Sequence, residues 1–150
     1  MPRLAQDTKP IALLVAEDDP EDRMLTVDAL EECRFKNPLF FVENGEDLLD
    51  FLYHRGTYAN RQQYPTPGLI LLDLNMPRKD GREALREIKG DPALRTIPVV
   101  ILTTSKAEED IIRSYQLGVN SFIAKPPRFE GLVDVMQTIS KYWLETVELP

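Results

Sequence analysis

Cysteine and histidine are almost absent from this sequence of 150 residues, and their scarcity excludes several kinds of site. The single cysteine, Cys33, rules out an internal disulfide and a zinc site built from cysteines. The single histidine, His54, rules out a cluster of histidines for catalysis or metal binding. The formal net charge is -7, which argues against nucleic acid as the main partner, because phosphate backbones attract basic surfaces.

Long apolar runs are missing too. No segment approaches the roughly 20 apolar residues that a membrane-spanning helix needs, and the polar start, MPRLAQDTKP, lacks the apolar core of a signal peptide. We therefore expect a cytoplasmic protein without a membrane partner. The composition, 43% hydrophobic and 29% charged, is typical of a globular domain.

Short apolar runs alternate with longer amphipathic segments, which is the pattern of a parallel α/β sheet. We expect strands at residues 11–16, 39–42, 69–73, 98–102 and 121–124. We expect helices to begin at Pro20, after the N-cap residue Asn44, after Gly81, and near Ala107 and Phe129. In the first of these helices a shared face is expected for Leu25, Ala29 and Cys33, with Leu30 at its edge.

A polar segment at residues 53–67, YHRGTYANRQQYPTP, interrupts this pattern. It contains Tyr53, Tyr58 and Tyr64 among charged and amide side chains. Two interpretations stay open for it. One is an extended helix end followed by a surface loop, and the other is a loop that contacts a partner protein through its tyrosines.

Reactive side chains follow four of the five predicted strands. In an open parallel sheet, ligands bind beyond the carboxyl ends of the strands, so groups at these ends should lie together. The groups, in chain order, are Glu17, Asp18 and Asp19 after the first strand, Asp73 after the third, Thr103 after the fourth and Lys125 after the fifth. Taken singly, acids before a proline can simply begin a helix and a lysine before a proline can simply end a strand. Their conjunction in this order predicts a site.

The residue types in this set indicate phosphoryl chemistry. Several carboxylates in a small space repel one another and need a cation, and oxygen ligands alone suit a hard ion such as Mg²⁺. Lys125 offers an ammonium group to a phosphate, and Thr103 offers a hydroxyl donor. A carboxylate can itself accept a phosphoryl group. Asp73, alone at the end of its strand, is the natural nucleophile.

Four motifs together resemble the receiver domain of two-component response regulators, the CheY-like family. They are VAEDDPEDR at 15–23, LILLDLNMPRKDG at 69–81, VVILTTS at 99–105 and FIAKP at 122–126. The resemblance implies a doubly wound (βα)5 flavodoxin-like parallel sheet with strand order 2-1-3-4-5. It assigns residues 10–145 to the receiver domain and leaves tails at residues 1–9 and 146–150. Within the family, the sequence is most similar in appearance to stand-alone regulators that partner phytochrome-type histidine kinases.

The resemblance also implies a role for each residue at the strand ends. Asp73 would be the phosphorylated aspartate, with Thr103 and Lys125 binding the phosphoryl group beside it as the other catalytic residues. The bond between Lys125 and Pro126 would be cis. The Mg²⁺ ligands would be Glu17, Asp18, Asp73 and the main-chain carbonyl of Asn75.

The output of such a domain would be a change on its surface. We expect no output module after the last predicted helix, and we expect the signal to leave through the face formed by residues 107–117, 121–124 and 129–143. Thr103 and Phe122 would form the switch, and Phe122, which lacks a hydroxyl, would act by packing. The expected output face includes Phe122, Ile111 and Tyr115, and it would bind a partner or a second copy as a homodimer. Alternatively, Ile111 or Tyr115 simply packs on the last helix.

The expected function is that of a stand-alone response regulator, a self-phosphorylating and self-dephosphorylating switch and not a metabolic enzyme. Its partner would be a sensor histidine kinase. The first alternative is an intermediate receiver in a phosphorelay. A haloacid-dehalogenase-type phosphatase would need an acid two residues after its nucleophile, where this sequence has Asn75. A receiver that never takes phosphate would be expected to lack part of the set Asp18, Asp73, Thr103 and Lys125, which is complete here.

Overall fold

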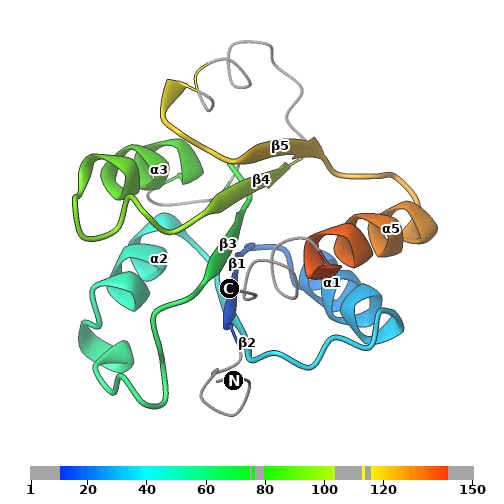
Figure 1. Cartoon of the computed structure of the whole chain (residues 1–150), viewed down its shortest axis with the longest axis horizontal. Coiled ribbons are helices and arrows are strands. Elements are labelled where there is room, and N and C mark those ends of the chain that lie inside the picture. The colour runs from blue at the N-terminus through cyan, green and yellow to red at the C-terminus, as the bar shows by residue number, and fades with distance from the viewer. Residues whose placement is uncertain (1–10, 75, 77–79, 104–112, 114–115, 142–150) are drawn as a thin grey trace, which may run out of the picture.

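Five parallel strands form one sheet at the centre of the molecule (Figure 1). The computed structural model describes residues 11–74, 76, 80–103, 113 and 116–141. The sheet order is β2-β1-β3-β4-β5, which confirms the predicted doubly wound topology. Its strands are β1 (Leu13–Ala16), β2 (Leu39–Val42), β3 (Leu69–Leu72), β4 (Val99–Thr103) and β5 (Ser121–Ala124).

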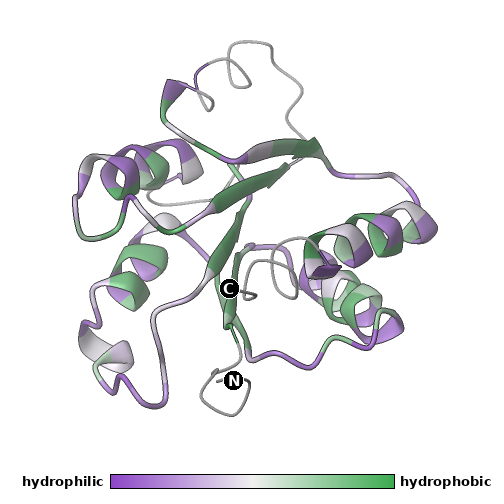
Figure 2. Ribbon diagram, in the orientation of Figure 1, coloured by the Kyte–Doolittle hydropathy of each residue, from purple (hydrophilic) through white to green (hydrophobic). Residues whose placement is uncertain are grey.

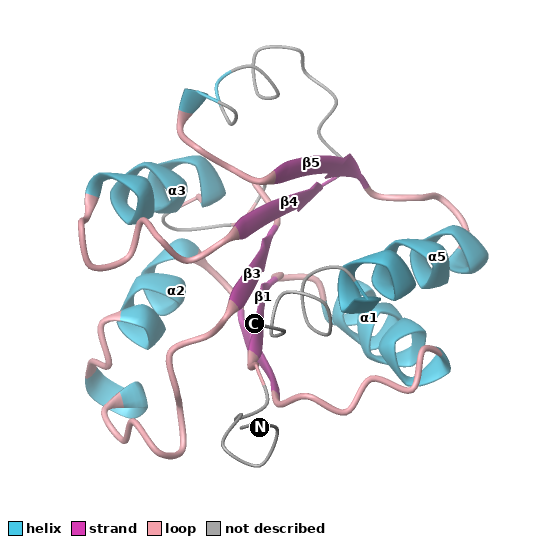
Figure 3. Ribbon diagram, viewed as in Figure 1, coloured by secondary structure: helices cyan, strands magenta, loops and turns pink. Residues whose placement is uncertain are grey.

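Helices cover both faces of this sheet (Figure 3). One face carries α1 (Pro20–Glu32) and α5 (Phe129–Ile139), which contact each other. The opposite face carries α2 (Gly45–Leu52) and α3 (Gly81–Gly90), which also contact each other. Most of the helix expected at 107–117 and the end of the helix expected to reach 143 lie outside the described residues. No helix in the described part of the chain is both long and apolar enough to cross a membrane.

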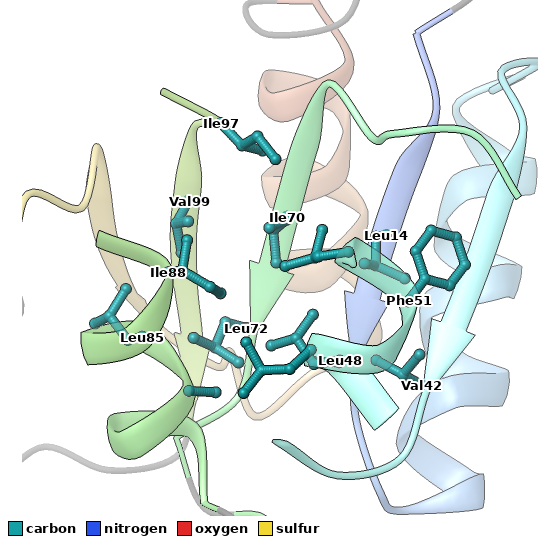
Figure 4. Packing of buried hydrophobic residues seen from close by; sticks show 14 of the residues in the cluster. Leu14, Val42, Leu48, Phe51, Ile70, Leu72, Leu85, Ile88, Ile97 and Val99 are labelled. Atoms are coloured by element: carbon teal, nitrogen blue, oxygen red, sulfur yellow. The ribbon is translucent and has the colours of Figure 1, made fainter. Parts of the chain in front are cut away.

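The core consists of two layers because successive strand residues point to opposite faces. Leu14, Ile70 and Ile101 lie in the layer under α2 and α3, which Figure 4 shows from close by. Leu13 and Leu71 lie in the layer under α1 and α5. Figure 2 shows the same division, with hydrophobic strands between helices that carry their polar residues outward. Each fully buried aliphatic side chain of this kind stabilises the fold by about 1.5–3 kcal/mol.

Side chains at the helix starts hold the loops that lead to the strand ends. Asn44 caps α2, as predicted, by accepting a hydrogen bond from the Asp47 amide at 2.8 Å. Asp19 caps α1 in the same way, with the Glu21 amide at 2.9 Å. Asp19 thus has a structural role that separates it from the acids before it.

The buried face of α1 differs from the predicted one. The helix buries Thr26, Ala29 and Leu30, whereas Leu25 is 42% exposed and Cys33 is half-buried. The predicted face is therefore confirmed for Ala29 and for Leu30 at its edge, and it is wrong for Leu25. The three buried positions have the i, i+3, i+4 spacing of one helix face, which contributes Ala29 and Leu30 to the core layer shared with the sheet and α5.

The polar segment at 53–67 folds back onto the domain through aromatic rings. It includes a short 3-10 helix, Gly56–Tyr58, and its Tyr58 and Tyr64 pack edge to face at 5.1 Å between ring centres. Both rings contact Phe51 of α2, which also contacts Phe40 of β2. We call Phe40, Phe51, Tyr58 and Tyr64 the aromatic cluster. Since its tyrosines are half-buried and packed against the core, they attach the segment to the domain itself.

Candidate functional site

The parallel register of the sheet brings the reactive strand ends together, as the sequence predicts. Ala16 of β1 pairs with Leu72 of β3, so the residues that follow them, Glu17 and Asp73, are neighbours. The Asp73 amide donates a hydrogen bond to the Ala16 carbonyl at 3.1 Å. On the other side, the Lys125 amide donates to the carbonyl of Thr103 at 2.9 Å.

Three acidic residues form a compact cluster at this edge. Glu17, Asp18 and Asp73 each present one carboxylate oxygen, and these oxygens all lie within 4.8 Å of one another. Glu17 is 4% exposed and Asp73 is 7% exposed, so their charges are poorly hydrated. The oxygen-only donor set fits a hard divalent cation such as Mg²⁺. Asn75, the fourth predicted ligand, lies outside the described residues.

The ammonium group of Lys125 connects this cluster to α1. Its Nζ donates hydrogen bonds to Glu17 Oε1 and, at 2.9 Å, to Asp22 Oδ2, and it lies 3.5 Å from Asp73 Oδ2. We call these four residues the lysine network. Asp22 was missed in the sequence reasoning. The signal that could have found it is its place in the first turn of the helix that starts at Pro20, beside the strand-end acids.

Burial and charge act against each other in this network. Burial raises the pKa of Glu17 to about 7, and the negative charge of Asp73 adds to this effect while Lys125 opposes it. Burial by itself would lower the pKa of Lys125, but its hydrogen bonds to Glu17 and Asp22 outweigh burial and raise that pKa. Lys125 therefore stays charged, and the Glu17 carboxyl keeps its proton to a higher pH than an ordinary glutamate does.

The hydroxyl of Thr103 orients the Asp73 carboxylate. Thr103 is fully buried, and its Oγ1 donates a hydrogen bond to Asp73 Oδ1 at 2.7 Å. With Lys125 near the other oxygen, both oxygens of Asp73 have fixed surroundings.

Phe122 of β5 is half-buried and packs against the core layer under α2 and α3. Ile111 and Tyr115, the other members of the predicted output face, lie outside the described residues.

Gly81 allows α3 to begin close to the turn after Asp73. Its amide donates a hydrogen bond to the Leu74 carbonyl at 3.1 Å. A Cβ atom at this position would lie 2.7 Å from the Leu74 Cα and would also meet the Asp73 carbonyl, so a larger residue would displace the turn.

Among the peptide bonds of the described residues none is cis, so the implied cis bond before Pro126 is wrong.

The parallel sheet, together with the acid cluster, Thr103 and Lys125 at its edge, is typical of one class of signalling protein. The sequence profile described as response regulator receiver domain matches residues 13–137, and the chain belongs to this family. The matched range lies within the predicted domain of residues 10–145.

Individual relatives point to a subgroup of the family. Response regulator Rcp1 from Synechocystis sp. is 43% identical over 145 residues, which are 97% of each chain. The crystal structure of the Mn(2+)-bound form of Rcp1 matches with a TM-score of 0.84, over 94% of this chain and 99% of that one. The phosphorylated cyanobacterial phytochrome response regulator RcpA is 40% identical, with a TM-score of 0.84 over 93% and 96% of the two chains. Response regulator RPA3017, in red light signaling of R. palustris, is 34% identical, with a TM-score of 0.86 over 93% and 98%.

Proposed function

We propose that this chain accepts a phosphoryl group from a histidine kinase onto Asp73 in a Mg²⁺-dependent reaction. The observation that carries this proposal is the setting of the Asp73 carboxylate. It has the Thr103 hydroxyl at 2.7 Å, the Lys125 ammonium at 3.5 Å and two further acids within 4.8 Å. The phosphorylated form of RcpA and the Mn(2+)-bound form of Rcp1 support the same chemistry by similarity.

In the proposed reaction, an oxygen of Asp73 attacks the phosphorus of a phosphohistidine. The new O–P bond forms as the P–N bond breaks, and the histidine nitrogen leaves with the bonding electron pair. The Lys125 ammonium and the Thr103 hydroxyl, which now contact Asp73, would turn to the phosphoryl oxygens and bind their negative charge. Mg²⁺ held by Glu17, Asp18 and Asp73 would supply further charge neutralisation when bound.

The product would serve as a signal and not as a metabolite. Attack of water on phosphorus would return Asp73 to its carboxylate, so the domain would switch off without a second protein. The similarity to RcpA and to a regulator in red light signaling favours a phytochrome-type histidine kinase as donor. Phosphorylation-dependent contact with another protein, or with a second copy, would carry the signal onward.

The direct test is phosphorylation by acetyl phosphate with MgCl₂, followed by intact-protein mass spectrometry. We expect one added phosphoryl group on the unaltered protein, none on Asp73→Asn, and a normal level on Asp28→Asn. Asp28 is a suitable control because it is an exposed acid of α1. Equal labelling of Asp73→Asn would overturn the assignment. Steady release of phosphate from small phosphate esters would favour the phosphatase alternative instead.

A further inference from the structure

Lys125 is anchored at two points that come from different elements. Glu17 follows β1, and Asp22 lies in the first turn of α1. Asp22 is 103 positions before Lys125 in the sequence. The Lys125 side chain is only 14% exposed, whereas that of Asp22 is 35% exposed. A lysine has a long flexible stem, so a single partner leaves its ammonium group several positions, and a second partner on a rigid helix restricts it to one.

The position of Asp22 on α1 is itself well fixed. The Asp19 side chain caps the helix, and the Asp22 carbonyl accepts a hydrogen bond from the Thr26 hydroxyl at 2.9 Å. The positive end of the helix dipole stabilises a carboxylate in the first turn. The main chain of Asp22 is therefore held in the first turn of α1, and from there its carboxylate reaches Lys125.

Without Asp22, the partners of the ammonium group among the described residues would all be members of the acid cluster. Glu17 and Asp73 would then hold Lys125, although both belong to the group of carboxylates that fits a cation. Cation and lysine would compete for the same carboxylates. A partner outside the cluster gives Lys125 a carboxylate that does not belong to the cation site, and so weakens this competition while Lys125 stays near Asp73.

We propose that Asp22 is a positioning residue for Lys125 and that it keeps the ammonium group beside Asp73. The proposal deepens the proposed function and rests on it, since the phosphoryl group on Asp73 is what Lys125 would bind. Asp22 touches neither Asp73 nor the incoming phosphoryl group in this account. It acts only through Lys125.

The test compares Asp22→Asn with Glu21→Gln, a matched control that removes one negative charge from the same helical turn at an exposed side chain. With acetyl phosphate and MgCl₂, we expect Asp22→Asn to be phosphorylated about threefold more slowly, the effect of one partly exposed ion pair. We expect Glu21→Gln to keep the normal rate. A normal rate in Asp22→Asn, or an equal loss in Glu21→Gln, would overturn the proposal.

A second measurement reports on Lys125 itself, in the unphosphorylated and metal-free protein. The NMR order parameter of the Lys125 ammonium group should fall in Asp22→Asn and stay unchanged in Glu21→Gln. An unchanged order parameter in Asp22→Asn would refute the positioning role even if phosphorylation became slower. If the unaltered protein took no phosphate, the proposed function would fail, and the order parameter alone would still decide whether Asp22 positions Lys125. Urea unfolding of each variant checks that it is folded.

Discussion

The lysine network and the aromatic cluster both hold distant parts of the chain together, but they use opposite kinds of contact. In the lysine network, one buried ammonium group joins β5 to β1, β3 and α1 through carboxylates. In the aromatic cluster, packed rings join the segment at 53–67 to β2 and α2. The first arrangement depends on charge, whereas the second depends on volume and shape.

This difference determines how each region responds to its surroundings. Removing one partner from a buried ion network leaves a charge without compensation, and the cost depends on pH and on any bound cation. Removing a buried ring leaves a void, and the free energy that this costs depends neither on pH nor on a bound cation. The lysine network is therefore suited to a switch, and the aromatic cluster is suited to keeping the scaffold constant while the switch operates.

The largest effect is expected at the centre of the aromatic cluster. Phe51 is 1% exposed, and Phe51→Ala should lower the free energy of unfolding by about 3–5 kcal/mol, because burial is lost and a cavity forms. The loss should be the same with and without Mg²⁺ when measured by urea unfolding. Phe129→Ala is the matched control, since Phe129 is 37% exposed and should cost far less. Similar losses in both variants would contradict the account of the cluster.

The next effect concerns the cation of the lysine network. Lys125→Met keeps an unbranched apolar stem but leaves Glu17 and Asp73 without their positive partner, so stability should fall by about 3 kcal/mol in metal-free buffer. Added Mg²⁺ should restore part of the loss, in contrast to Phe51→Ala. Urea unfolding with a Mg²⁺ titration measures both. Lys36→Met, at an exposed lysine, should show neither effect, and a loss insensitive to Mg²⁺ in Lys125→Met would refute the contrast.

A third effect is the dependence of stability on pH. The pKa of Glu17 lies at about 7 in the folded protein, above its ordinary value of 4.5, so the folded state binds more protons in this window. This contribution to stability is fully present below pH 4.5 and is lost as pH rises toward the folded pKa, by about 3 kcal/mol. Glu17→Gln should flatten this profile in metal-free urea unfolding, whereas Glu21→Gln should not. A profile that keeps its slope in Glu17→Gln would assign the titration to another group.

The strand ends of the site could be predicted from sequence, and the physical reason is the period of the strands. In a parallel sheet the carboxyl ends of the strands lie at one edge, so Glu17, Asp73, Thr103 and Lys125, which stand at these ends, meet there. Apolar runs and turn residues mark such strands plainly. The strand order was implied by resemblance to a family and is confirmed by the sheet.

Contacts that depend on helix rotation or on loop paths could not be predicted in the same way. A shift of one residue turns a helix by about 100°. The sequence therefore did not decide whether Leu25 or Thr26 is the buried position of α1. It also gave no way to predict that the Asp22 side chain contacts Lys125. The segment at 53–67 has no period at all, so the packing of its tyrosines depends on the surface beneath it.

The smallest expected effect tests whether charge matters near the aromatic cluster. Arg55 pairs with Asp50 at 3.0 Å and lies 4.8 Å above the Tyr53 ring. Both charged side chains of the pair are about half exposed, at 57% and 44%, so water and salt screen the interaction. Arg55→Ala should lower the free energy of unfolding by less than about 1 kcal/mol, and Mg²⁺ should not change this value. Urea unfolding at low and high salt measures it, and a loss as large as that of Lys125→Met would show that charge also stabilises this side of the domain.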